Sequence, residues 1–179
     1  MNSKIFRSID GLFQKKLNFI KIKNIRKFKK KRLSIYGKGN SISSLPFVNG
    51  SLLLNLKLKN DIKLSKNKKF VEVNGNIEAY EVHNFLIKRK LFFPSFPSYP
   101  SVTIGACIAN CTHGISPKFG IMSDYIEEIR LFNPNFGSKT LSNKKNKKLF
   151  GLTIGGMGLT GIILSAKLKI FKLNSTYVK

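Results

Sequence analysis

The chain has 179 residues, of which 42% are hydrophobic, and its 28 lysines and five arginines give a formal net charge of +25. This length is that of a single domain, and 15 phenylalanines supply apolar material for a core. No apolar run approaches the ~20 residues that span a bilayer, and the N-terminal residues lack the apolar segment of a secretory signal. Because the chain holds only two cysteines, a disulfide scaffold is excluded and a reducing, cytoplasmic location is expected.

The positive charge is mostly lysine and is spread over residues 15–32, 57–69 and 139–148. Basic proteins gain affinity for phosphate backbones whether or not that is their function, and base-specific contacts favour arginine. The charge therefore predicts a solvated cationic surface. A noncatalytic basic module that binds nucleic acid or an anionic membrane is the alternative.

The first half of the chain predicts short strands and one helix. Residues 17–32 alternate apolar and basic side chains and fit a strand, a short helix or both. Residues 33–36 form a β-prone run that ends in a glycine turn, and residues 51–56 and 70–73 also predict strands. Residues 77–90 carry apolar side chains near helical spacing and acidic residues in the first turns, and they predict an amphipathic helix.

The second half predicts further strands with short helical turns between them. Residues 91–97 contain two prolines and predict an extended segment, which precedes a short helix around Ile108. Residues 125–141 predict a hairpin, residues 143–149 a single helical turn and residues 161–171 a final strand. The final strand should place four apolar side chains on one face and lysines on the other; the four are Leu164, Ala166, Leu168 and Ile170.

This pattern of many strands and few short helices predicts an α+β fold. A Rossmann fold is disfavoured, because no Gly-x-Gly-x-x-Gly sequence opens a long helix, and the P-loop sequence does not occur.

Three segments rich in glycine and other small residues, 36–44, 103–114 and 155–161, each lie beside an apolar run. Glycine allows a positive φ and a close approach of the backbone to a ligand. Successive backbone N–H groups in such loops form concavities that bind phosphate. Three of these loops in one chain predict an extended, phosphate-bearing ligand, and a dinucleotide fits better than a small metabolite.

In their order and spacing, the three segments resemble the PCMH-type FAD-binding domain of the vanillyl-alcohol-oxidase flavoproteins. The sequence is most similar to the sugar oxidases of that family, such as decaprenylphosphoryl-ribose oxidase and the sugar-lactone oxidases. Residues 35–41 look like the pyrophosphate loop, residues 103–114 like the second flavin loop and residues 149–163 like the third. The resemblance extends over residues 33–170.

This resemblance implies two small α+β lobes with FAD between them, the first in residues 1–45 and the second in residues 46–173. The pyrophosphate loop would contribute Gly37, Lys38, Gly39, Asn40, Ser41 and Ile42. The flavin and ribityl chain would contact Thr103, Gly105, Ala106, Asn110, Thr112, His113 and Gly114. The pyrophosphate and adenosine would also contact Met157, Gly158, Gly161 and Ile163.

The chain also departs from the pattern of this family. Asn40 stands where members that attach flavin covalently through this loop carry histidine, so noncovalent FAD is expected. Ala106 stands where relatives commonly have a second glycine. Relatives continue into a substrate-binding half that completes the flavin site, whereas this sequence resembles the FAD domain alone.

The resemblance therefore implies the FAD-binding domain of an oxidoreductase in which a sugar or another alcohol transfers hydride to flavin. No residue of this chain is identified as the catalytic base. A separate chain that supplies the substrate half is a possible partner, and specific binding of nucleic acid is not expected.

Two further sets of residues have alternative interpretations. His113 is expected to contact the cofactor, or else to order its own loop, whereas His83 is expected to be structural. Cys107, Cys111 and His113 could suggest a metal site, but zinc sites use four nitrogen or sulfur ligands, often with closer cysteines. Packed thiols and no metal are therefore expected.

Overall fold

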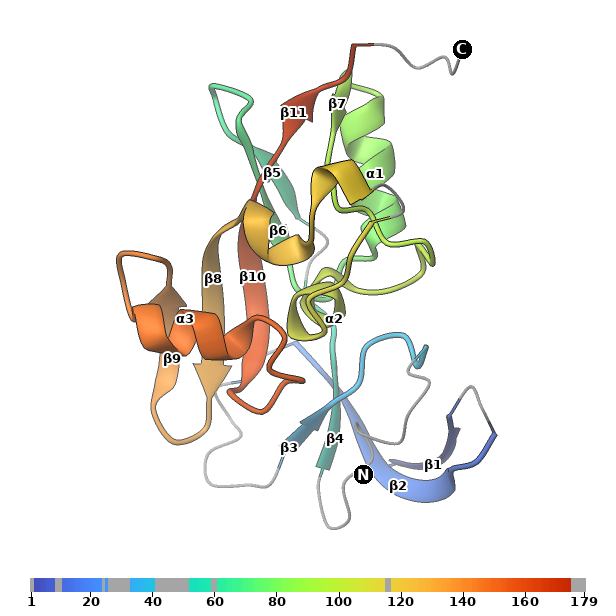
Figure 1. Cartoon of the computed structure of the whole chain (residues 1–179). Helices are drawn as coiled ribbons and strands as arrows, with labels where there is room; N and C mark the ends of the chain where they lie inside the picture. Colours follow the sequence, from blue (N-terminus) through green and yellow to red (C-terminus); the bar gives the residue numbers. More distant parts are fainter. Residues whose placement is uncertain are drawn as a thin grey trace.

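The computed structural model describes residues 2–8, 11–23, 25, 33–40, 52–58, 61–114 and 117–174. Figure 1 shows two lobes, with a four-stranded sheet in the lower one and a five-stranded sheet with the helices in the upper one. This arrangement confirms the predicted α+β fold class. No helix in the described part of the chain is long and apolar enough to cross a membrane.

The first lobe contains strands β1 (Asn2–Arg7), β2 (Gln14–Ile22), β3 (Leu33–Ile35) and β4 (Leu52–Leu56), in the order β1-β2-β4-β3. The β1 and β2 strands form an antiparallel hairpin, whereas β4 runs parallel to both of its neighbours. The sheet therefore continues beyond the lobe boundary expected at residue 45. A strand was one expectation for residues 17–32; of this range, residues 24 and 26–32 lie outside the described residues.

The second lobe is built on an antiparallel sheet in the order β5-β6-β10-β8-β9. Its strands are β5 (Ile62–Leu64), β6 (Phe70–Asn74), β8 (Ile126–Asn133), β9 (Gly137–Leu141) and β10 (Ile162–Lys169). A small second sheet pairs β7 (Leu91–Phe92) with β11 (Phe171–Lys172). The helices are α1 (Ala79–Ile87), α2 (Ile104–Ala109) and α3 (Lys147–Thr153), with 3-10 turns at Pro117–Phe119 and Met122–Tyr125.

The five-stranded sheet has apolar side chains on both faces. Ile129 and Leu131 belong to the larger core cluster, together with Ile108 of α2. Phe132 and Ile162 are paired across β8 and β10 and belong to a separate cluster with β4 of the first lobe. This second cluster joins the lobes through burial of apolar surface, the main stabilising contribution in folding.

Two predicted elements differ from the structure. The helical turn expected in residues 143–149 begins only at Lys147 and continues to Thr153 as α3, because Asn146 occupies a left-handed conformation (φ 53°) before it. In β10 a register shift lies between Ile163 and Ser165. A β-bulge of this kind changes which face successive side chains occupy, so Leu164 packs with the cluster between the lobes and not on the face of Ala166 and Leu168.

Candidate functional site

The first glycine segment leaves β3 and is held by β4. The Tyr36 amide donates to the Leu54 carbonyl at 2.8 Å. The side-chain amide of Asn55 donates to the carbonyls of Tyr36 and Gly37, both at 2.9 Å. The carbonyl oxygens of Tyr36 and Gly37 are therefore bound to the first lobe.

The backbone amides of residues 37–40 differ from these two carbonyls in their hydrogen bonding. No hydrogen bond joins the amides of residues 37–40 to another described residue. Gly39 has φ +86°, a left-handed conformation that glycine adopts without strain. A run of unpaired amides around a left-handed glycine suits an anion such as phosphate. Ser41 and Ile42, which were also expected here, lie outside the described residues.

The same loop packs closely against the second lobe. A methyl group at Gly37 would lie 3.0 Å from Thr103 Oγ1, so the absence of a side chain permits this approach. The Asn40 side-chain amide donates to the Ser101 carbonyl. Lys38 Nζ lies 2.6 Å from a carboxylate oxygen of Glu78. The fold thus brings the first two glycine segments together, as Figure 1 shows for the loop after β3 and α2.

The start of the second segment positions α2. Thr103 is its N-cap, and the hydroxyl accepts from the Ala106 amide at 3.3 Å. The Gly105 amide donates to the Gly75 carbonyl at 2.8 Å, and a methyl group at Gly105 would lie 2.9 Å from that oxygen. Gly105 therefore fixes α2 against the turn between β6 and α1.

The end of the second segment presents two exposed polar side chains. Asn110 donates to the Ala106 carbonyl at 3.0 Å, and His113 Nδ1 lies 2.9 Å from the Gly114 carbonyl. Gly114 itself is buried against the backbone of residues 94–96. The side chains of Asn110 and His113 thus remain accessible to a ligand, whereas Gly114 holds the loop in place.

Cys107 lies within α2, and Cys111 follows the end of this helix. Cys107 is buried, and burial raises the pKa of its thiol to about 11. Cys111 is partly exposed, with φ +46°. The thiols are free, and no group of three potential metal ligands occurs among the residues that the structure describes.

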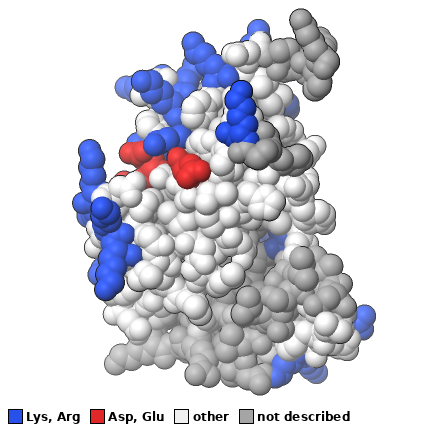
Figure 2. Space-filling view, in the orientation of Figure 1, with Lys and Arg blue, Asp and Glu red and all other residues white. Residues whose placement is uncertain are grey.

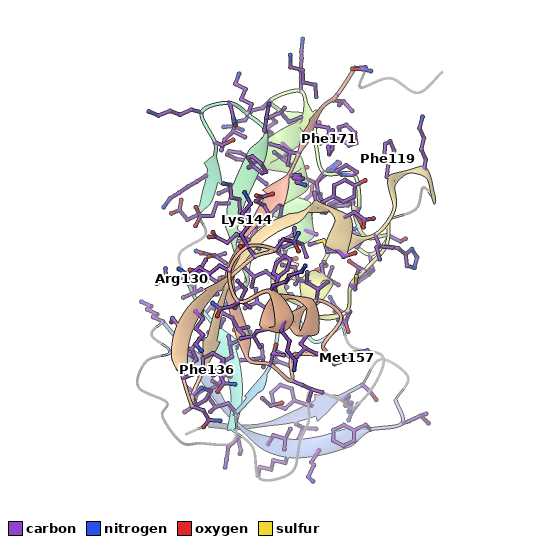
Figure 3. All side chains as sticks on the ribbon, turned by 60° about the vertical axis from the view of Figure 1, so that its left-hand side comes forward. Phe119, Arg130, Phe136, Lys144, Met157 and Phe171 are labelled. Atoms are coloured by element: carbon purple, nitrogen blue, oxygen red, sulfur yellow. The ribbon has the colours of Figure 1, made fainter. Side chains whose placement is uncertain are left out.

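The third segment is tied to the end of α2 by its backbone. The Gly155 amide donates to Ile108 at 3.0 Å, and the Met157 amide donates to Ala109 at 2.9 Å. The Met157 side chain is 55% exposed, and Figure 3 places it below α3, on the side of the first lobe. Gly158 has φ +78° and open space around it.

Two other expected residues of this segment serve packing. A methyl group at Gly161 would collide with the Phe132 carbonyl, so this glycine permits the close passage of β10 beside β8. The side chain of Ile163 is buried in the larger core cluster. The third segment therefore contacts the second segment mainly through residues 155–157.

Several polar residues around these loops were not predicted from sequence. Asn55, Glu78 and Ser101 hold the first loop, yet none belongs to a glycine segment. Asn76 lies beside Gly75, and its side-chain oxygen is buried without a hydrogen-bond partner among the described residues. A buried acceptor without a partner costs about 1–3 kcal/mol, so Asn76 is a further candidate to bind a ligand.

Figure 2 shows that the described cations on this face of the molecule lie mostly along its margins, at the top, at the left and at the lower right. Uncharged residues cover most of the centre of the face, and α2 and the third segment lie there in the orientation of Figure 1. The charge is therefore not concentrated over the glycine loops.

Three loops from distant parts of the sequence thus converge around α2, with unpaired amides at one end and accessible polar side chains at the other. Residues 19–137 match the family model described as "FAD binding domain". The chain belongs to this family. FAD is therefore its cofactor. The amides of residues 37–40, which no described residue pairs, fit the pyrophosphate of that cofactor.

Individual relatives are sugar and lactone oxidases by name. D-arabinono-1,4-lactone oxidase of Candida glabrata is 27% identical over 165 residues, which cover 88% of this chain and 31% of that protein. L-gulonolactone oxidase of Bos taurus is 27% identical, with 78% of this chain and 32% of that protein covered. Decaprenylphosphoryl-beta-D-ribose oxidase of Mycolicibacterium smegmatis is 25% identical, with 79% and 31% covered. The chain thus spans about a third of the length of these relatives.

Proposed function

We propose that this chain binds FAD noncovalently and forms the FAD-binding part of an oxidoreductase that oxidises a sugar or another alcohol. The observation that carries the proposal is the first glycine loop. The amides of residues 37–40 have no partner among the described residues, while the loop is fixed on one side by Asn55 and on the other by Ser101 and Glu78. The names of these three oxidases support the substrate class.

The residues of this chain would bind and orient the cofactor. The amides of residues 37–40 would donate to the pyrophosphate, and the exposed side chains of Asn110 and His113 would contact the more polar parts of the ligand. When bound, FAD supplies the hydride acceptor for substrate oxidation. We propose that the groups that bind the substrate and accept its proton lie in a substrate half beyond the matched region, in the same protein or in a partner chain.

Noncovalent binding follows from the chemistry of Asn40. A side-chain carboxamide lacks the nucleophilic ring nitrogen through which histidine bonds to flavin in the covalent members of the family. Asn40 instead donates its side-chain N–H to the Ser101 carbonyl. The residue therefore anchors the loop to the second lobe.

The proposal is tested by titrating the purified chain with FAD and following the quenching of flavin fluorescence. Saturable uptake is expected, and acid precipitation should then release all the flavin into the supernatant. Lys145→Ala, in the exposed connection before α3, is the control and should bind FAD as the unmodified chain does. Flavin in the acid pellet would contradict noncovalent binding, and no uptake would favour the basic binding module.

Activity provides a separate test. We propose that the groups that position a substrate lie outside these 179 residues. Proximity and orientation of this kind are worth about 7–11 kcal/mol of a barrier. The FAD-loaded chain should therefore not be bleached rapidly by sugars or sugar lactones under anaerobic conditions. Rapid, saturable bleaching would show that the active site is already complete.

A further inference from the structure

Four side chains connect the first glycine loop to the second lobe. Lys38 Nζ lies 2.6 Å from Glu78 Oε1, and the Ser101 hydroxyl donates to Glu78 Oε2 at 2.8 Å. The side-chain amide of Asn40 donates to the Ser101 carbonyl. Lys38 and Asn40 flank the left-handed Gly39. One end of the turn is therefore attached to Glu78 and the other to Ser101, and these two residues are themselves hydrogen-bonded.

These two residues lie on a well-fixed part of the second lobe. Glu78 precedes α1 and forms a β-bridge with Thr103, and the next amide, that of Ala79, donates to the Val102 carbonyl at 2.8 Å. Glu78 and Ser101 thus stand on adjacent extended segments, next to the N-cap of α2. A loop attached to them has its position set by the second lobe.

The opposite charges of Lys38 and Glu78 pair with each other within the protein. The hydrogen bond from Lys38 is the largest cause that lowers the pKa of Glu78, followed by that from Ser101, and the same pair raises the pKa of Lys38. Glu78 accepts from Lys38 and Ser101 with different oxygens. The Lys38 ammonium is therefore directed at a carboxylate, whereas the loop amides remain for the phosphates.

We propose that Lys38, Asn40, Glu78 and Ser101 form a latch between the lobes that holds the first glycine loop in its phosphate-binding conformation. These are positioning residues for the cofactor. The proposal rests on FAD binding by this loop. The latch and a direct contact between Lys38 and phosphate predict opposite changes in the Kd for FAD when the charge of Glu78 is removed.

The deciding variant is Glu78→Gln. It removes a negative charge, so long-range electrostatics alone would strengthen the binding of anionic FAD. Direct contact of Lys38 with phosphate would also predict stronger binding, because Lys38 would be released from its partner. The latch predicts the opposite, a Kd for FAD raised about twofold to fivefold, which corresponds to the usual strength of a partly exposed ion pair.

The matched control is Glu72→Gln, which makes the same charge change on an exposed position of β6. Kd would be measured by fluorescence titration at low and high salt, and thermal unfolding would be followed on the same samples. The difference between the unmodified chain and Glu78→Gln should shrink at high salt, because added ions screen the pair. Glu72→Gln should not weaken FAD binding.

A charge exchange tests the pair independently of how well one variant folds. Lys38→Glu alone should weaken FAD binding, and Lys38→Glu combined with Glu78→Lys should recover part of the loss. Equal or tighter binding by Glu78→Gln, or no recovery in the exchanged variant, would overturn the latch while FAD binding stands. Failure of the unmodified chain to take up FAD would overturn the proposed function together with the latch.

Discussion

Two glycines in helices should respond in opposite directions to the same substitution by alanine. Gly105 lies in α2, where an added methyl group would stand 2.9 Å from the Gly75 carbonyl oxygen. Gly151 lies in α3, where nothing stands within 4 Å of the methyl position. Gly105→Ala should destabilise the protein and weaken FAD binding, whereas Gly151→Ala should stabilise the protein.

The magnitudes follow from helix propensity and packing. Alanine in place of a helical glycine gains about 0.5–1 kcal/mol, and at Gly151 nothing opposes this gain. At Gly105 the methyl group pushes against a backbone oxygen that also accepts the Gly105 amide at 2.8 Å. Overpacking of this kind costs about 1–3 kcal/mol, and weakening the hydrogen bond adds about 1 kcal/mol. The net loss should be about 1–3 kcal/mol.

The assay is thermal unfolding followed by circular dichroism, together with FAD titration. For a chain of this size, each kcal/mol shifts Tm by about 2–4 °C. Gly105→Ala should lower Tm by roughly 2–12 °C, and Gly151→Ala should raise it by roughly 1–4 °C. The same Tm for both variants, or a higher Tm for Gly105→Ala, would refute the claim that α2 packs against the Gly75 carbonyl at Gly105.

Three further outcomes are expected. Gly39→Ala should weaken FAD binding more than Gly158→Ala in fluorescence titration, because both positions have positive φ but only the methyl group at Gly39 collides with the Tyr36 ring; equal losses would contradict this. Iodoacetamide should label Cys111 in the folded protein and Cys107 only after unfolding, since burial raises the pKa of Cys107 to about 11. Mass spectrometry of the labelled peptides measures this, and labelling of Cys107 in the folded protein would contradict it. Burial lowers the pKa of His83, so the folded state binds this proton less readily than the unfolded state. Stability should therefore fall as pH drops below about 6.5, and urea unfolding of His83→Gln should show a smaller fall.

Local features of the sequence were sufficient to predict many of the strands and helices, and also the family. The alternation of Val71 and Val73 with polar residues, closed by Asn74-Gly75, indicated β6, and the helical spacing after it indicated α1. These signals are readable because a strand or helix with one buried face repeats its apolar residues at the period of its own geometry. The order of the three glycine segments likewise indicated a FAD-binding domain without any knowledge of their contacts.

Only the tertiary structure decided which residues meet. Nothing near Lys38 in the sequence identifies Glu78 as its partner. Nothing in residues 37–40 shows that their amides find no partner among the described residues, while Asn55 binds the carbonyls of Tyr36 and Gly37. The register shift in β10 is also set by pairing with β8, and it moved Leu164 to the cluster between the lobes. Hydrogen bonds and ion pairs of this kind join segments that are distant in the chain. Local periodicity reports only which side of an element is buried, and the fold determines what lies against it.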